Sequence, residues 1–182
     1  SGTSSSTGSV TFRNNASVTI NDDFFLGRNG DGTLTVESGA DVTTDDFLSA
    51  FETGSTATTT ITGSGTTLTA NRQLLVGRFG DGTLTVESGA DVTAGNLKVG
   101  INTGSPSIAT ATVTGTGTTL NTGKARIGND GTGTLNILNN ASFDSDDIVD
   151  VGKGSGDGTL LVDGATFTVT AGNADLNIAS GT

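Results

Sequence analysis

A long segment of this chain occurs twice with a single difference. The sequence GRNGDGTLTVESGADVT at 27–43 returns as GRFGDGTLTVESGADVT at 77–93, 50 residues further along. A shorter period lies beneath it, because GTL begins at Gly32, Gly82, Gly133 and Gly158, while TGSGTTL and TGTGTTL occupy the alternate places. The repeating unit is therefore about 25 residues long, which indicates a solenoid of stacked copies.

Alignment by this unit places apolar residues in three columns, a column being the set of residues at one equivalent position of successive units. The first column contains Phe12, Val36, Ile61, Val86, Val113, Ile137 and Val162. The second contains Val18, Val42, Leu68, Val92, Leu120, Phe143 and Phe167. The third follows a polar turn and contains Leu26, Ser49, Val76, Val99, Ile127, Val151 and Ile178. Most column residues have an apolar neighbour two positions away, the period of a strand with one buried face, so each unit is predicted to form three short strands.

A unit of this length cannot bury its apolar faces alone, but stacked copies form one continuous core. We therefore expect an all-β fold, a right-handed parallel β-helix (β-solenoid) of about seven rungs with three short strands in each. The predicted domain spans 9–182 after a flexible lead-in at 1–8, and its rungs begin near residues 9, 32, 57, 82, 109, 133 and 158. The alternative, an antiparallel sandwich or a propeller, predicts repeats of whole blades or no repeat.

One position of the third column is polar. Ser49 lies in the run FLSAF, which also permits a shifted register. The alternative inward-facing pairs are Leu48 with Ala50, and Phe47 with Phe51. The register of this rung therefore stays open at this stage.

Composition argues against several classes of protein. Apolar residues make up only 32% of the chain, a fraction typical of disorder, but their alternating order and the many β-branched residues favour strands. The formal net charge of −11 disfavours nucleic acid and anionic membranes as partners. The absence of Cys excludes disulfides and thiolate metal sites. No apolar run of about 18 residues is present, so no membrane insertion is expected.

The alternation of two kinds of unit resembles the passenger-associated repeats of bacterial autotransporter adhesins and related surface proteins. The resemblance rests on two segments, TTTITGSGTTLTANRQLLVGRFGDGTLTVESGADVT at 58–93 and TATVTGTGTTLNTGKARIGNDGTGTLNILNNASF at 110–143. It extends over nearly the whole chain from about residue 9. The resemblance implies an exported, elongated β-helical stalk.

Two pairs of acidic residues form the first candidate site. Asp22 and Asp23 are predicted to lie beside Asp45 and Asp46 at one corner of successive rungs, and carboxylate oxygens are ligands that Ca²⁺ prefers. The next rung interrupts the pattern with an Asn and an Arg. Because Asp is also a common turn former, we expect structural turns and no cofactor, with calcium as the weaker alternative.

Outward threonines on the first strand of each rung form the second candidate site. This ladder of TxT pairs consists of Thr33, Thr35, Thr58, Thr60, Thr83, Thr85, Thr110 and Thr112. Such arrays on a flat face resemble those of ice-binding solenoids, in which hydroxyl and methyl groups order water. The ladder is expected to stop at Asn136 and Leu161, and Thr is in any case favoured on an exposed strand face.

No catalytic site is predicted. The chain has no His and no Cys, so it lacks the usual general base at neutral pH and the strongest nucleophile. Its Lys and Arg residues are expected to be scattered over different corners: Arg13, Arg28, Arg72, Arg78, Lys98, Lys124, Arg126 and Lys153. The chain is therefore not expected to be an enzyme.

These observations favour a structural or adhesive repeat segment of an exported bacterial surface or filament protein, outside the cell or at its surface. The segment would serve as a stiff stalk or an adhesive face. Expected partners are neighbouring solenoid repeats or copies stacked end to end, because the last rung has no polar cap, together with a surface or glycan ligand. The alternatives are an ice-binding β-solenoid that uses the Thr ladder and a phage tail-fibre or tailspike shaft.

Overall fold

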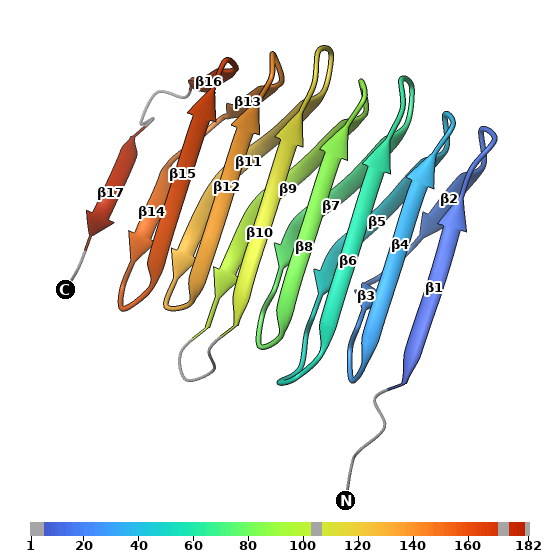
Figure 1. The fold of residues 1–182 in the computed structure, drawn as a ribbon, viewed down its shortest axis with the longest axis horizontal. Coiled ribbons are helices and arrows are strands. Elements are labelled where there is room, and N and C mark those ends of the chain that lie inside the picture. Colours follow the sequence, from blue (N-terminus) through green and yellow to red (C-terminus); the bar gives the residue numbers. More distant parts are fainter. Residues whose placement is uncertain (1–5, 103–106, 171–174, 181–182) are drawn as a thin grey trace, which may run out of the picture.

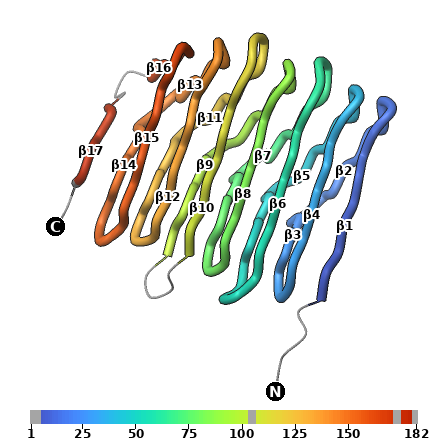
Figure 2. The backbone as a smooth tube through the Cα atoms, viewed as in Figure 1, coloured from blue at the N-terminus to red at the C-terminus, as the bar shows by residue number. Residues whose placement is uncertain are grey.

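The computed structural model describes residues 6–102, 107–170 and 175–180, and every regular element among them is a β-strand. The strands coil through seven rungs, about 25 residues apart, and pair in parallel between rungs, so the predicted β-solenoid is confirmed (Figure 1). Each rung crosses the front of the molecule in one sheet and returns behind it in a second (Figure 2). Within the described ranges, no helix is long and apolar enough to cross a membrane.

The first sheet, here called sheet A, contains the first strand of every rung. Its strands in spatial order are β1 (Thr7–Phe12), β4 (Asp31–Glu37), β6 (Thr56–Thr62), β8 (Asp81–Glu87), β10 (Ile108–Thr114), β12 (Thr132–Leu138) and β15 (Asp157–Asp163). They lie side by side as one regular face in Figure 1.

The second sheet, here called sheet B, returns the chain on the opposite side. Its strands are β2 (Ser17–Ile20), β3 (Phe24–Leu26), β5 (Asp41–Ser49), β7 (Thr67–Val76), β9 (Asp91–Ile101), β11 (Thr119–Asn129), β13 (Ser142–Ser145), β14 (Val149–Lys153), β16 (Thr166–Val169) and β17 (Leu176–Ser180). Three strands per rung, as predicted, occur only in the first, sixth and seventh rungs. In the other four rungs, the second and third segments form one long strand.

The polar residues expected to turn the chain within sheet B keep an extended backbone in these middle rungs. The ladder absorbs the extra residues as register shifts, between Thr44 and Asp46 where β5 pairs with β7, and between Ala70 and Leu74 where β7 pairs with β9. Such bulges bend a strand without ending it. In these rungs a bend of the strand therefore replaces the expected turn, and sheet B is bent along this line.

All three predicted columns are confirmed by the pairing register. Members of each column are Cα partners from rung to rung in the first column, the second and the third. Val36, Ile61 and Val86 of the first column are fully buried. The columns therefore form the walls of one continuous apolar core.

Ser49 keeps its place in the third column, between Leu26 and Val76. It is buried, and its Oγ donates a hydrogen bond to the Leu75 carbonyl oxygen at 3.0 Å. Phe47, two residues earlier, belongs to the core. The pairing therefore places this rung in the unshifted register. The buried hydroxyl of Ser49 is tolerated there because it has an acceptor.

A residue with positive φ follows the third column in every rung, and in the first six rungs the chain then turns back towards sheet A. These residues are Gly27, Ala50, Gly77, Gly100, Gly128, Gly152 and Ala179. At Gly77 an added Cβ would lie only 2.8 Å from the Cβ of Ala109. Glycine is favoured there both by the left-handed backbone and by the close approach of the neighbouring strand.

The first rung begins earlier than predicted. Thr7 and Gly8, assigned to the lead-in, pair with Asp31 and Gly32 and so belong to β1. They extend the ladder because β4 already offers an extended partner at these positions. The rest of the predicted lead-in, apart from Ser6, lies outside the described residues.

Candidate functional site

The Thr ladder lies on the outer face of sheet A, as predicted, and one of its two columns is longer than expected. Thr33, Thr58, Thr83 and Thr110 are Cα partners, and Thr134 and Thr159 continue the column. The parallel column of Thr35, Thr60, Thr85 and Thr112 ends, as expected, at Asn136 and Leu161. Hydroxyl groups therefore follow one line along the described length of sheet A.

The acidic candidates are brought together, but an arginine lies against them. Arg72 donates from Nε and Nη2 to the carboxylate of Asp46, and its Nη2 lies 3.3 Å from Oδ1 of Asp23. Asn71 donates to Oδ1 of Asp45 at 3.3 Å. The Asn and Arg that interrupt the acidic pattern are thus its hydrogen-bonding partners.

Asp22 contributes its carbonyl oxygen, which accepts a hydrogen bond from Oγ1 of Thr44 at 2.7 Å. Burial and the neighbouring carboxylates of Asp22 and Asp46 raise the pKa of Asp23, against the opposing charge of Arg72. Among the residues that the structure describes, no group of three or more His, Cys, Asp or Glu side chains has a metal-binding arrangement. The geometry of this corner is that of an ion-paired bend of sheet B.

A different surface emerges on the outer face of sheet B, one residue before the third column. The outward residues there are Cα partners in the order Phe25, Leu48, Leu75, Lys98, Arg126, Asp150 and Asn177. The first three are apolar and the next two are cationic. A strand alternates faces, so apolar residues at an outward position are unexpected unless something covers or uses them.

Residues beyond the corner fold back over this apolar strip. The Phe51 ring packs edge-on against Phe25, with centroids 5.1 Å apart. The guanidinium of Arg78 lies 4.4 Å from the Phe51 centroid and 4.8 Å from that of Phe79. Together they leave a hollow of about 360 Å³, here called the outer groove, lined by Asp23, Phe25, Asp46, Leu48, Phe51, Gln73, Leu75, Arg78, Lys98 and Ile101.

The prediction that Lys and Arg residues are scattered over different corners is wrong for four of the eight. Lys98 and Arg126 are Cα partners on adjacent strands, and with Lys124 they line a second hollow of about 200 Å³ beside the outer groove. Burial and the charges of Arg126 and Arg78 lower the pKa of Lys98, against a smaller opposing effect of Asp46. Arg78 and Lys98 line the outer groove, and Lys98, Lys124 and Arg126 line the adjoining hollow, so these four residues are here called the cation cluster.

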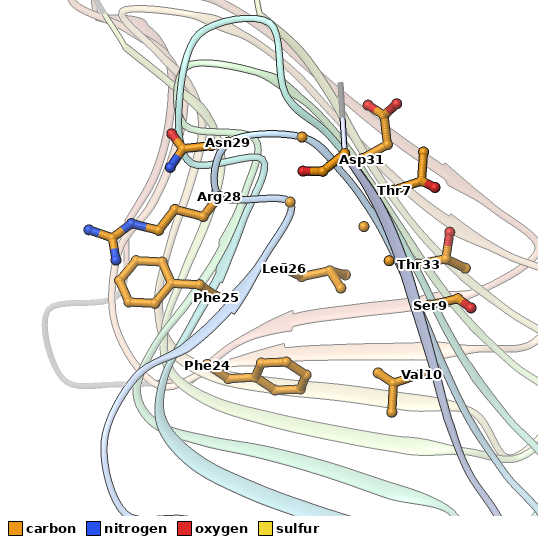
Figure 3. A pocket seen from close by; sticks show the side chains of 15 residues that line it. Thr7, Ser9, Val10, Phe24, Phe25, Leu26, Arg28, Asn29, Asp31 and Thr33 are labelled. Atoms are coloured by element: carbon orange, nitrogen blue, oxygen red, sulfur yellow. The ribbon is translucent and has the colours of Figure 1, made fainter. Parts of the chain in front are cut away.

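A third hollow, of about 450 Å³, lies beside β1, β3 and the start of β4. Figure 3 shows Val10, Phe24 and Leu26 reaching into it, with the Arg28 guanidinium beside the Phe25 ring on the other side of β3. Val10 and Phe24 pack against the core, and Leu26 is part of it. This hollow is therefore the edge of the solenoid core in the first rung.

The fold defines the molecule as a parallel β-solenoid repeat protein with a threonine-rich face and a grooved, partly cationic face. Comparison of the chain with protein-family models, with curated proteins and with solved structures finds no match.

Proposed function

We propose that this chain is a structural and adhesive repeat segment of an exported bacterial surface or filament protein, located outside the cell or at its surface. The observation that carries the proposal is the unbroken stack of rungs, in which three columns run through all seven and are apolar except at Ser49. Backbone hydrogen bonds and a shared core link every rung to the next, so the stack resists bending and holds its faces at fixed spacing. The resemblance to passenger-associated repeats supports the same role.

The seventh rung supports a further step, the stacking of rungs from another segment or another copy. Val162, Leu176 and Ile178 of this rung are 40%, 45% and 71% exposed, whereas their column partners Ile137, Val149 and Val151 are buried. Among the described residues, their strands β15 and β17 pair on one side only, with β12 and β14, and an unpaired strand edge is a template for pairing. A head-to-tail contact of this kind repeats without closing and yields a filament.

Small-angle X-ray scattering and negative-stain microscopy over a range of protein concentrations test this proposal. We expect rods that lengthen in steps of about 34 Å, the height of seven rungs at the spacing of paired strands. Ile178→Asp places a charge in the stacking contact and is expected to stop the lengthening. Leu161→Asp, which adds the same charge to the outward face of the same rung, is the matched control. Monomers at every concentration would contradict the stacking, and a constitutive trimer would favour a tail-fibre shaft.

The Thr ladder supports a second candidate, an ice-binding face. The line of hydroxyl groups from Thr33 to Thr159 supports it, because paired strands repeat at about 4.8 Å and so space the groups evenly. Thermal hysteresis in the wild type that is lost in Thr83→Lys and kept in Thr93→Lys, on the other sheet, is the expected result for this function. Freezing behaviour identical to that of a buffer control contradicts it.

A further inference from the structure

We propose that the outer groove and the adjoining cation cluster bind an acidic glycan, an oligosaccharide that carries carboxylate or sulfate groups. The inference deepens the adhesive part of the proposed function and rests on it, since it names what the adhesive face holds. It stands on three features of the groove: an apolar floor, an edge of hydrogen-bond acceptors and a cationic end.

The floor of the groove is apolar although it lies on the outer face of the solenoid. Leu48 and Leu75 line it and lie outside the core, but they are only 5% and 2% exposed, so the accessible apolar surface belongs mainly to the half-buried rings of Phe25 and Phe51. The Phe25 and Phe51 rings meet edge-on beside them. Sugar rings present apolar C–H faces that pack against such a surface, and ligand sites in general combine an apolar lining with a few placed polar groups.

One edge of the groove offers acceptors. Asp23, Asp46 and Gln73 lie at the start of the third segment in successive rungs, with Asp46 and Gln73 as Cα partners. Arg72 already fixes the two carboxylates in place, and each carboxylate oxygen can accept more than one hydrogen bond. Sugar hydroxyl groups are the donors that match this edge.

The other end of the groove offers cations. Lys98 forms no ion pair with any described residue, and its Nζ donates only to Oε1 of Gln73 at 2.9 Å. Arg126, on the next strand, has a buried Nε without a hydrogen bond to any residue that the structure describes, 3.8 Å from Oδ2 of Asp150. In a chain of net charge −11, four of the eight Lys and Arg residues thus gather beside one groove. An anion placed there relieves the repulsion between Lys98 and Arg126 and gains charge-assisted hydrogen bonds.

The groove favours an acidic glycan over an acidic peptide. It lies on the face of sheet B, where the backbone groups pair within the ladder, so a peptide finds no free strand edge to extend. A peptide rich in Asp or Glu also offers few donors to the acceptor edge, because ionised carboxylate side chains only accept hydrogen bonds. An acidic sugar carries both kinds of group, hydroxyls for the acceptor edge and an anion for Lys98.

Isothermal titration calorimetry of the whole chain tests the proposal with tetragalacturonate, a heparin-derived tetrasaccharide, neutral maltotetraose and a short polyglutamate peptide. We expect at least one acidic sugar to bind about 10-fold or more tightly than maltotetraose and polyglutamate, with affinity that falls as salt rises. The tighter of the two acidic sugars identifies the anion as carboxylate or sulfate. Absence of binding by both acidic sugars, or equal binding by the neutral sugar or the peptide, overturns the inference.

Lys98→Gln locates the site, and Arg13→Gln, an equal change of charge at an exposed position in the first rung, is its control. We expect about 10-fold weaker binding in Lys98→Gln and unchanged binding in Arg13→Gln. Both variants should keep the wild-type Tm and rod length, because the fold already disfavours the charged form of Lys98. Equal affinities of the two variants overturn the location. Failed sugar binding with rods retained overturns this inference alone, whereas failed rod formation overturns the proposed stacking.

Discussion

Arg72 binds the carboxylate of Asp46, in the preceding rung, through both Nε and Nη2. The Asp46 side chain is only 8% exposed, and this arginine is its ion-pair partner. The same guanidinium reaches Asp23 one rung further back. A single arginine therefore ties three rungs together at the bend of sheet B.

Arg72→Ala is expected to lower the Tm at pH 7, because two neighbouring carboxylates lose their counter-charge. The loss should shrink near pH 3, where carboxylates become protonated and repel each other less. Thermal unfolding followed by circular dichroism at both pH values measures the effect. Arg13→Ala, at an exposed position, is the control and should change neither value. Equal losses at the two pH values would show that Arg72 acts through packing and not through charge.

Calcium is expected to be dispensable. The Arg72 guanidinium lies against the carboxylates of Asp23 and Asp46, so a second cation would meet repulsion there. Unfolding in EDTA and in millimolar calcium should give the same Tm. A fall of more than about 5 °C in EDTA, the size that accompanies loss of one or two kcal/mol in a chain of this length, would contradict this prediction.

The inward register predicts opposite fates for two adjacent substitutions. Val86 is fully buried in the first column, whereas Thr85 lies on the outer face of β8. Val86→Asp should abolish cooperative unfolding, because an unpaired buried charge costs several kcal/mol. Thr85→Asp should change stability by less than about 1 kcal/mol. Urea unfolding of both variants decides the point, and equal stabilities would refute the register.

The core of this fold is predictable because each column repeats one chemical property at one position of the unit. The division of a rung into separate strands is less predictable from the sequence. Asp45 and Asp46, or Asn71 and Arg72, read as turn residues, but the ladders on either side hold them extended and the surplus residue becomes a bulge. Local turn preference gives way here to hydrogen bonding between rungs.

The sequence does not predict the groove, for a different reason. Leu75, Lys98 and Arg126 are unevenly spaced along the chain, so their proximity appears only after alignment to the third column, where each directly precedes Val76, Val99 or Ile127. That alignment was available from the sequence. The folding back of Phe51 and Arg78 was not, since it depends on the path of the chain beyond the positive-φ corner.

Asp150→Asn should destabilise the protein in a pH-dependent manner. Burial acts to raise the pKa of Asp150, but hydrogen bonds from Asn177 and Lys153 and the charges of Lys153 and Arg126 outweigh it, so the pKa is lowered. A carboxylate with a lowered pKa contributes stability that is full above its unfolded pKa of about 3.9 and is lost as pH falls through the folded value.

We therefore expect this substitution to cost about 2 kcal/mol at pH 7, the size typical of lost hydrogen bonds to a charged group, and little near pH 2. Asp147→Asn, whose side chain is 46% exposed beside Lys124, is the control and should cost less than about 0.5 kcal/mol at either pH. Melting curves from pH 2 to 7 measure both. A cost for Asp150→Asn that persists at pH 2 would contradict the ionic role.

Two buried threonines should respond in opposite ways to replacement by the isosteric valine. Thr59 faces the core between Leu34 and Leu84, and among the described residues its Oγ1 has no hydrogen-bond partner. Thr59→Val removes an unsatisfied hydroxyl and should stabilise the chain by about 1 kcal/mol, raising the Tm by about 2–4 °C. Thr66, also buried, accepts a hydrogen bond from the Gly39 N–H at 3.0 Å, so Thr66→Val should destabilise by a similar amount. Calorimetry of both variants tests this, and a fall in Tm for Thr59→Val would show that its hydroxyl is satisfied after all, by a bound water for instance.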